Sequence, residues 1–332
     1  MKKYKIFITG GAGYVGSRLS EELAESGHSI TIFDTEYFGN SNLDKIKNIK
    51  VIKGDIRDIN HLSESSKGND IFLHLACISN DTSFALNEKL STSVNLECFE
   101  PMVIAAKKNK ISRFIYASTS SVYGLSEKKD VKEDHPLLPL TLYNKYKGEC
   151  EPLLIKHTDE NFTGVIFRPA TVCGYSKRIR LDLTVNILTN FAYNKGYIKV
   201  FGGDQMRPNL NIKDYIRAVN LFIDAPKNEI NNEIFNVGYQ NLKVKDIALI
   251  VKKVCEDKYN KKIDVQFESS DDKRSYHINS DKIYEKLNFK PLHTIEEAVE
   301  ELCEAFDRDK IPNSFENDIY YNVKRMLNLN VQ

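Results

Sequence analysis

The glycine-rich segment at residues 9–16 limits what this chain can fold into more than any other part of the sequence. Gly10, Gly13 and Gly16 stand between a short apolar run at residues 5–9 and a helical pattern at residues 14–26. Glycines at this spacing permit a tight turn, a close approach to a pyrophosphate, and close packing of helix on sheet. The helix N-terminus would offer unpaired N–H groups and a positive dipole end to the phosphates. The segment therefore predicts a dinucleotide-binding strand–turn–helix unit.

Two acidic positions extend this unit. Asp34 ends a second apolar run at residues 30–33, at the distance from Gly16 that is typical of the acid that holds a ribose 2′-hydroxyl. Its carboxylate would repel a 2′-phosphate, which favours NAD over NADP. Asp55 and Ile56 follow a third run at residues 51–53, where they could hold an adenine edge, although a capping turn is an equal alternative.

Apolar runs alternate with helical patterns through the first half of the chain. This alternation predicts an α/β fold, a Rossmann-type doubly wound parallel sheet, with a smaller mixed α/β lobe for the substrate. We expect residues 1–170 to form the NAD-binding domain, with a return to the sheet near residues 210–238, and residues 171–332 to form mainly the second lobe. The expected strands lie at residues 5–9, 30–33, 51–53, 71–75, 113–117 and 164–167, and the expected helices at 14–26, 89–109 and 143–157.

Composition limits the classes of partner. Lysine plus arginine number 47 and aspartate plus glutamate 46, so the net charge of +1 argues against a nucleic-acid partner. No apolar run is long enough for a membrane helix or a signal peptide. The six cysteines are scattered singly, with no histidine at ligand spacing. We therefore expect no disulfide framework, no metal site and a cytoplasmic protein.

Tyr143 and Lys147 lie four positions apart, on one face of a predicted helix. A free phenol has a pKa near 10, and a neighbouring ammonium together with a nicotinium charge would lower it. Tyr143 could then take a proton from a substrate hydroxyl while the adjacent carbon gives hydride to nicotinamide. Such a pair is common on helices by chance. The polar run at residues 118–121 supports a catalytic site, because it ends the fifth strand, where ligands bind parallel sheets.

Taken together, these motifs resemble the extended short-chain dehydrogenases/reductases, within the NAD-dependent nucleotide-sugar epimerase/dehydratase family that includes UDP-glucose 4-epimerase. The resemblance covers essentially the whole chain and also rests on Arg168-Pro169. It implies a nucleoside-diphosphate sugar as substrate and a catalytic set of Thr119, Tyr143 and Lys147. The implied contacts to NAD are Gly10, Gly13, Tyr14, Val15, Gly16, Asp34, Asp55, Ile56, Leu75, Ala76, Asn95, Tyr143 and Lys147.

The resemblance also implies substrate contacts. Arg207 and Arg274 fall where such enzymes clamp a diphosphate, a task that suits the fork of donors on arginine. Without the resemblance, each would be read as a solvated surface arginine. Arg178 and Arg180 could face phosphate or lie in a solvated basic loop, and residues 79–81 could touch the sugar or form a polar turn. The remaining substrate candidates are Ser79, Asn80, Thr119, Thr171, Arg180 and Asn186.

Departures from the family pattern bear on the reaction. Family dehydratases and sugar-acid decarboxylases carry an acid directly after the catalytic threonine, where this chain has Ser120 and Ser121, so dehydration is disfavoured. Thr171 replaces an asparagine that usually touches the substrate, which leaves the sugar open. Residues 175–186 are similar to a subgroup from surface-polysaccharide sugar pathways that includes GDP-heptose 4-dehydrogenases.

The sequence thus predicts an NAD-dependent nucleoside-diphosphate-sugar epimerase that oxidises a hexose or heptose at C4, in surface-polysaccharide sugar biosynthesis. A nucleotide-sugar 4-dehydrogenase that releases the keto sugar would use the same residues. A non-catalytic NAD-binding scaffold or sensor is the alternative from another class, because fold does not fix function.

We also expect a homodimer. Apolar residues on the two helices that flank the catalytic strands would be buried in a four-helix bundle, unless the C-terminal segment covers them within one chain. These residues are Val94, Met102, Val103, Ala105, Ala106, Tyr146, Leu153 and Leu154.

Overall fold

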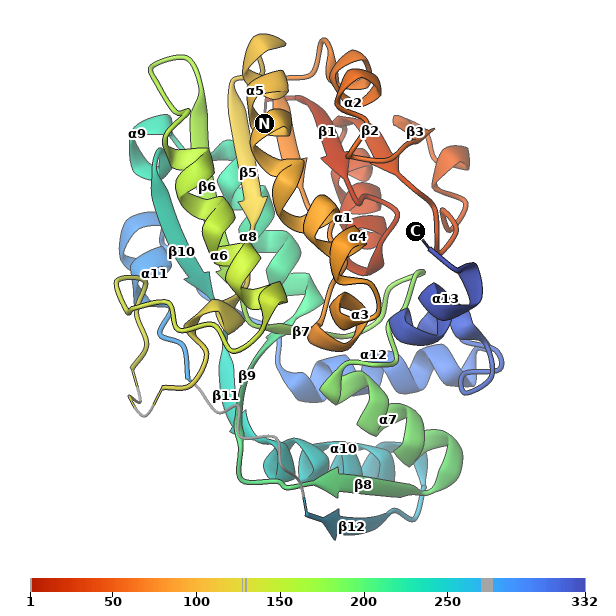
Figure 1. Cartoon of the computed structure of the whole chain (residues 1–332). Coiled ribbons are helices and arrows are strands. Elements are labelled where there is room, and N and C mark those ends of the chain that lie inside the picture. Colours follow the sequence, from red (N-terminus) through yellow and green to blue (C-terminus); the bar gives the residue numbers. More distant parts are fainter. Residues whose placement is uncertain (1, 127, 129, 270–276, 332) are drawn as a thin grey trace.

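The computed structural model describes residues 2–331 apart from 127, 129 and 270–276. Its centre is a seven-stranded parallel sheet with the strand order β10-β6-β5-β4-β1-β2-β3 (Figure 1). Every strand predicted in the first half of the chain is present, and the return near residues 210–238 supplies β10. The Rossmann-type fold is therefore confirmed. The strands are β1 (Lys5–Thr9), β2 (Ser29–Asp34), β3 (Ile49–Lys53), β4 (Ile71–His74), β5 (Arg113–Ala117), β6 (Thr163–Pro169) and β10 (Glu233–Val237).

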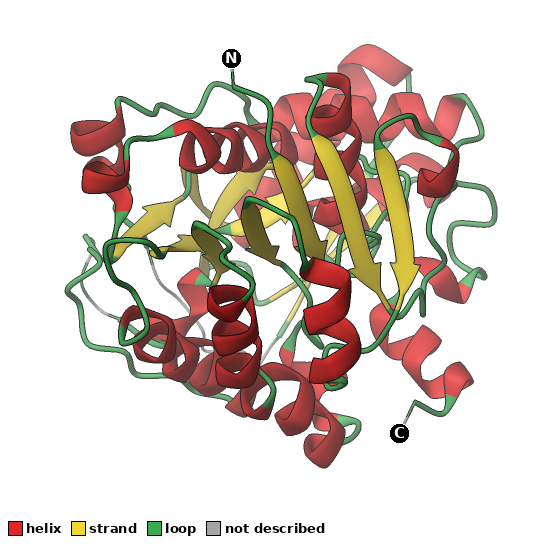
Figure 2. Cartoon of the chain, turned by 90° about the horizontal axis from the view of Figure 1, so that it is seen from above, coloured by secondary structure: helices red, strands yellow, loops and turns green. Residues whose placement is uncertain are grey.

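Helices cover both faces of the sheet (Figure 2), because alternate side chains of each strand point to opposite sides. Ile6 and Ile8 of β1 are buried in one core, which α1 and α8 share. Phe7 is buried in a second core, with α2, α5 and α6. The two cores hold the C-terminal ends of the strands at one edge. These helices are α1 (Tyr14–Glu25), α2 (Ile59–Ser66), α5 (Phe99–Lys108), α6 (Leu142–Ile155) and α8 (Ile212–Asp224).

The helix predicted at residues 89–109 is interrupted. It consists of α4 (Glu88–Thr92), a π-helical turn, η2 (Ser93–Glu97), and α5. A π turn adds one residue to a helix, and a pattern of helical period does not reveal it. The turn carries Asn95, whose side chain donates to the Ile78 carbonyl at 2.9 Å and accepts from the Ile78 N–H at 2.8 Å. Asn95 thereby fixes the loop that follows β4.

The smaller lobe has its own core beneath the main sheet in Figure 1, formed by α7 (Thr184–Lys195), α10 (Val244–Tyr259) and α12 (Ile295–Asp307). Helical patterns at residues 183–193, 244–253 and 295–306 predict these helices, and an apolar run at residues 198–201 predicts β8 (Tyr197–Phe201). The sequence does not predict the strands that complete the two small sheets. The domain division at residue 170 stays a prediction. None of the helices in the described part of the chain is long and apolar enough to cross a bilayer. The missed strands are β7 (Thr171–Cys173), β9 (Met206–Asn211), β11 (Gln240–Lys243) and β12 (Asp264–Glu268).

The C-terminal segment returns to the main sheet's edge as α13 (Asn322–Leu329), which lies near α3 (Asp81–Ala85) in Figure 1. Met326 packs in a small apolar cluster with Ile78 and Leu90. Arg325 Nε donates to the Tyr37 carbonyl at 2.7 Å. This helix therefore connects the loop after β2 with the loop after β4.

The side chains expected to form a dimer interface are largely covered by their own chain. Met102, Val103, Ala105, Ala106 and Leu154 are buried in the second core, beneath α5 and α6. Val94, Tyr146 and Leu153 are half-buried. The expectation that these positions leave surplus apolar surface for a homodimer is therefore wrong for most of them, since the sheet of the same chain covers them. The homodimer stays a prediction, which sedimentation equilibrium tests.

A buried ion pair connects α6 with the sheet. Arg168 on β6 donates to both carboxylate oxygens of Glu151, from Nη2 at 2.6 Å and from Nε at 2.9 Å. Ser118 Oγ donates to the same carboxylate at 2.6 Å, and Arg168 Nη1 donates to the Tyr123 hydroxyl oxygen at 2.6 Å. Because both charged side chains are only 3% exposed, the pair depends on these hydrogen bonds to offset its desolvation.

Replacing Glu151 with glutamine should leave Arg168 buried without a counter-charge and lower the free energy of unfolding by about 3–5 kcal/mol. Urea denaturation at neutral pH measures this change. The matched control is Lys145→Gln, which removes an exposed ion pair with Glu149 on the same helix. That variant should lose less than about 1 kcal/mol. Equal destabilisation by the two variants would contradict a structural role for the buried pair.

Candidate active site

A cavity of about 610 Å³ opens where the main strands end. Loops that follow β1, β2, β4, β5 and β6 form its walls. Because β1 lies between β2 and β4, the strand order reverses here, and ligands of such sheets bind at this point. The predicted site residues that line it are Gly10, Gly13, Tyr14, Val15, Gly16, Asp34, Asp55, Ile56, Leu75, Ala76, Ser79, Asn80, Thr119, Tyr143, Lys147, Thr171, Arg180 and Arg207.

Three predicted site residues are not among those that line the cavity. Asn95 uses its amide on the backbone of Ile78, as described above. Asn186 is buried, accepts from the Gly174 N–H at 3.1 Å and donates to the Arg180 carbonyl at 2.8 Å. Both asparagines position loops rather than line the cavity. Arg274 lies outside the described residues.

The glycine loop has the shape that a dinucleotide requires. Gly10 has a φ of +74°, and a Cβ there would lie 2.6 Å from the backbone nitrogen of Ala76. A Cβ at Gly16 would lie 2.3 Å from the Gly10 carbonyl oxygen. Gly13 precedes α1, and no side chain of the described residues caps this helix N-terminus. The first N–H groups of α1 are thus left for an anionic ligand, so the residues present fit a dinucleotide diphosphate.

Asp34 joins the glycine loop to the expected ribose position. Its Oδ2 accepts from the Ala12 N–H at 3.0 Å, and its Oδ1 accepts from the Glu36 N–H at 2.9 Å. Burial raises the pKa of Asp34, and these two hydrogen bonds oppose the shift. Each carboxylate oxygen has a further lone pair that can accept from a ribose hydroxyl.

The turn expected at Asp55 is present, and a contact to an adenine edge stays a prediction. Asp55 lines the cavity, and it also forms a turn in which its Oδ1 accepts from the Arg57 N–H at 2.9 Å. Arg57 Nη2 lies 2.6 Å from Asp55 Oδ2. Partial burial alone would raise the pKa of Asp55, but the hydrogen bonds from Arg57 outweigh burial and lower it. Asp55 therefore carries a negative charge at neutral pH.

The proposed catalytic residues all line this cavity. Lys147 is 3% exposed, donates to the Ala117 carbonyl at 2.7 Å, and lies 5.0 Å from the centre of the Tyr116 ring. Tyr143, one helical turn earlier, is half-buried and lines the cavity with Thr119. An ammonium has three donors, so Lys147 can also donate towards the cavity. This arrangement can move a proton between a tyrosine and a bound hydroxyl.

Thr119 belongs to a short chain of hydrogen bonds. Its Oγ1 lies 2.8 Å from Ser121 Oγ, and Ser121 Oγ donates to Asn144 Oδ1 at 2.5 Å. Because Ser121 gives its proton to Asn144, Thr119 donates to Ser121, and the Thr119 oxygen can accept from a substrate hydroxyl. Sequence reasoning did not single out Asn144, since nothing in the local pattern shows that α6 turns it towards Ser121.

The basic segment at residues 178–180 is not a solvated loop, because Arg178 and Arg180 are both buried. Arg180 Nε lies 2.9 Å from Asp182 Oδ1, and its Nη1 donates to Ser79 Oγ at 3.0 Å. The polar-turn interpretation of residues 79–81 holds in part, since Asn80 Oδ1 accepts from the Ser83 N–H at 2.8 Å and caps α3. The interpretation of residues 178–180 as a solvated loop omitted the burial of both arginines, which arises from the tertiary fold.

Asn322 and Met326 of α13 also line the cavity, and sequence reasoning missed them. The helical pattern at residues 315–329 is weak and contains no binding motif. Nothing in the sequence therefore indicates that this segment reaches the site. Across the described residues, no group of three or more His, Cys, Asp or Glu side chains could hold a metal ion.

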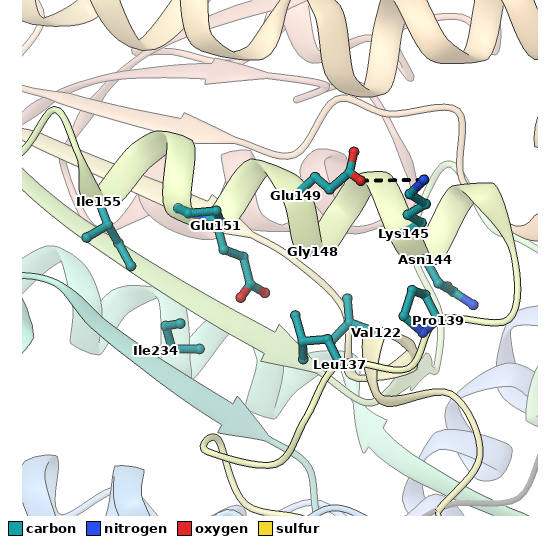
Figure 3. Close-up of a pocket in the computed structure, with 11 residues that line it drawn as sticks. Val122, Leu137, Pro139, Asn144, Lys145, Gly148, Glu149, Glu151, Ile155 and Ile234 are labelled. Atoms are coloured by element: carbon teal, nitrogen blue, oxygen red, sulfur yellow. Dashed lines mark ion pairs between the residues drawn. The ribbon is translucent and has the colours of Figure 1, made fainter.

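A second cavity, of about 540 Å³, lies on another side of α6 (Figure 3). Mainly apolar side chains line it, among them Val122, Leu137 and Ile234. The ion pair of Lys145 and Glu149 lies at one side of it in Figure 3. Since Thr119, Tyr143 and Lys147 all line the larger cavity, we place the candidate active site there.

Comparisons with known proteins agree with this geometry. The model of the NAD-dependent epimerase/dehydratase family matches residues 6–238. A UDP-N-acetyl-alpha-D-glucosaminuronate decarboxylase of Bacillus cytotoxicus is 30% identical over 267 residues, which cover 75% of this chain and 79% of that protein. A UDP-glucose 4-epimerase of Lactobacillus helveticus is 25% identical over 266 residues, or 74% of this chain and 80% of that one. The structure of a UDP-glucose 4-epimerase of Thermotoga maritima with UDP-glucose superposes with a TM-score of 0.82 at 22% identity, and covers 92% of this chain and 99% of that chain.

Asp34→Ala should weaken NAD binding about 10-fold or more, because a hydrogen bond to a charged group is worth about 1.5–3 kcal/mol. Loss of the negative charge should also reduce the discrimination against NADP. Isothermal titration calorimetry with both cofactors measures the two effects. Asp44→Ala, at an exposed position of the loop after β2, is the control and should change neither. An unchanged ratio of NAD to NADP affinity in Asp34→Ala would remove Asp34 from the cofactor site.

Proposed function

Because this chain belongs to the NAD-dependent epimerase/dehydratase family, we propose that it is a nucleoside-diphosphate-sugar epimerase that acts at C4 of the sugar. The observation that carries the proposal is that Thr119, Tyr143 and Lys147 line the same cavity as the glycine loop. A dinucleotide held at that loop could extend to Tyr143 within the same cavity. The expected place of the reaction in surface-polysaccharide biosynthesis stays a prediction of the sequence.

The residues of this chain would handle the protons of the reaction. Tyr143 would take the proton of the sugar hydroxyl at C4 and later return it, with the Lys147 ammonium stabilising its phenolate. Thr119 would hold the same hydroxyl through its oxygen. NAD, when bound, supplies the hydride acceptor and donor for C4. Arg207, which lines the cavity, would hold the diphosphate of the sugar nucleotide, whereas Arg180, which also lines it, is paired with Asp182.

Two serines support epimerisation over dehydration or decarboxylation. The positions after Thr119 are Ser120, which is buried, and Ser121, which is hydrogen-bonded to Thr119 and Asn144. A serine hydroxyl is a poor acid and a poor base near neutral pH, so neither residue replaces a carboxyl group. Asp81 also lines the cavity, but its carboxylate accepts from Thr141 Oγ1 at 2.6 Å, at the start of α6.

The C-terminal helix supports an epimerase over a 4-dehydrogenase that releases its keto sugar. A dehydrogenase exchanges its reduced cofactor after every turnover, whereas an epimerase restores NAD within each cycle. Asn322 and Met326 of α13 form part of the cavity wall, and Arg325 attaches α13 to the loop after β2. Because α13 adds to the wall of the cavity, it favours retention of a bound dinucleotide.

Tyr143→Phe should lower the turnover number by about 10²- to 10⁴-fold, the usual contribution of a general acid–base residue. Its affinity for NAD should change little, because the hydroxyl moves a proton rather than holds the dinucleotide. Tyr146→Phe is a matched control on the same helix, with its ring packed against Phe84. Turnover in Tyr143→Phe that equals the Tyr146→Phe rate would exclude Tyr143 as the base.

A panel of UDP-, GDP- and dTDP-sugars should yield a C4 stereoisomer of one of them with no net formation of NADH. Proton NMR follows the sugar, and absorbance at the nicotinamide band follows the cofactor. Stoichiometric NADH with a keto sugar would identify a dehydrogenase instead. Release of carbon dioxide from a sugar acid would identify a decarboxylase, and either result would overturn the proposal.

A further inference from the structure

Arg178 is a buried cation whose partners are incomplete. The side chain lines the cavity, yet the residue is only 4% exposed. Its Nη2 donates to Asn322 Oδ1 at 2.6 Å, and its guanidinium carbon lies 3.8 Å from the centre of the Phe38 ring. The Nε and Nη1 atoms have no hydrogen-bond partner among the described residues. These two atoms carry three N–H bonds in total, so most of the donor capacity of Arg178 is unused.

The neighbouring Arg180 shows how a satisfied arginine looks in the same segment. Arg180 is paired with the carboxylate of Asp182 and also donates to Ser79, as described above. No ion pair of this kind is found for Arg178 within the described residues. Burial, together with the charge of Arg180, lowers the pKa of Arg178 to about 9, although the more distant charges of Asp182 and Asp34 oppose the shift. A buried cation with no carboxylate in direct contact is unfavourable, and an anionic ligand would remove the imbalance.

The segment that carries Arg178 lies along α1, the helix that begins at the glycine loop. Ser176 Oγ lies 2.7 Å from Ser17 Oγ, and Arg18 Nη1 donates to the Tyr175 carbonyl at 2.7 Å. The carboxylate of Asp34, which accepts from the Ala12 N–H of the glycine loop, acts on Arg178 through its charge. Arg178 and the uncapped N-terminus of α1 therefore line the same cavity, and each of them favours a negatively charged ligand.

We propose that Arg178 binds the diphosphate of the dinucleotide, opposite the N–H groups of α1, and that Asn322 of α13 positions it there. Guanidinium suits this task because its planar donors match phosphate oxygens and it stays charged. A small side-chain rearrangement would bring Nε and Nη1 from their buried positions to the phosphate oxygens. The proposal depends on NAD as the cofactor and not on which reaction the enzyme performs.

Asn322 is itself held by two other loops of the site. Its Nδ2 donates to Ser79 Oγ at 3.0 Å, and its backbone N–H donates to Asp182 Oδ2 at 3.2 Å. The first residue of α13 thus contacts the loop after β4 and the segment that carries Arg178. The orientation of the guanidinium therefore depends on the docking of the C-terminal helix.

Arg178→Gln in the full chain should raise the Kd for NAD and for ADP by about 10- to 100-fold, the range expected for charge-assisted hydrogen bonds. The Kd for adenosine, which has no phosphate, should change less than about 2-fold on the same grounds. Calorimetric titration measures NAD and ADP, and competition with NAD measures adenosine. Lys177→Gln is the matched control: this neighbour is exposed and paired with Glu21, and it should bind all three ligands as the unaltered protein does.

Two further variants keep the test decisive if Arg178→Gln folds poorly. Arg178→Lys keeps the charge and should lose less NAD affinity than the glutamine variant, and Asn322→Ala should weaken NAD and ADP in the same direction. A lower melting temperature with unchanged Kd values for NAD and ADP would reduce Arg178 to a structural residue and overturn the proposal. Unchanged NAD binding with weaker binding of UDP or GDP would assign Arg178 to the substrate and overturn it as well. None of these measurements uses turnover, so their outcome is independent of the proposed epimerase reaction.

Discussion

The buried contact between Arg168 and Glu151 holds α6, the helix that carries Tyr143 and Lys147, against the sheet. Glu151 lies on the same face of α6 as Tyr143 and Lys147, one helical turn beyond the lysine. Its carboxylate is shared by Arg168 at the end of β6 and Ser118 at the end of β5. In a low-dielectric interior such a network tolerates little displacement, because an unmade hydrogen bond there is expensive. The positions of the three proposed catalytic residues therefore depend on the carboxylate of Glu151, which is not one of them.

The main sheet could be predicted because its signals are local. Each parallel strand is a short apolar run followed by a turn, and the glycine loop identifies where the first helix begins. The missing elements depend on contacts between distant segments. β9 pairs with β7 and β11, which lie far from it in sequence, and its own run, Met206–Asn211, has neither a continuous apolar stretch nor regular alternation. The π turn around Asn95 is hidden for a different reason, since one extra residue leaves the helical pattern almost unchanged.

The part of the candidate site that directly follows the strand ends could be predicted from the sequence. Parallel strands bring their C-terminal ends to one edge, so residues that follow β1, β2, β4 and β5 had to meet. Sequence could not show which polar side chains face the ligand and which hold the protein together. Asn186 faces two backbone groups, Arg180 faces a carboxylate, and Arg178 keeps unused donors. That distinction arises from burial and partners, which only the folded chain defines.

The position of α13 has a consequence for the order in which the molecule is assembled. All other residues of the cavity wall precede Asn322 and Met326 along the chain. As a nascent chain emerges, the strands and helices of the main sheet can form while the dinucleotide site still lacks one side. Ligand binding stabilises a fold only once the binding state exists. The cofactor can therefore give its full stabilisation only after synthesis has passed residue 326, and until then the chain relies on its apolar cores.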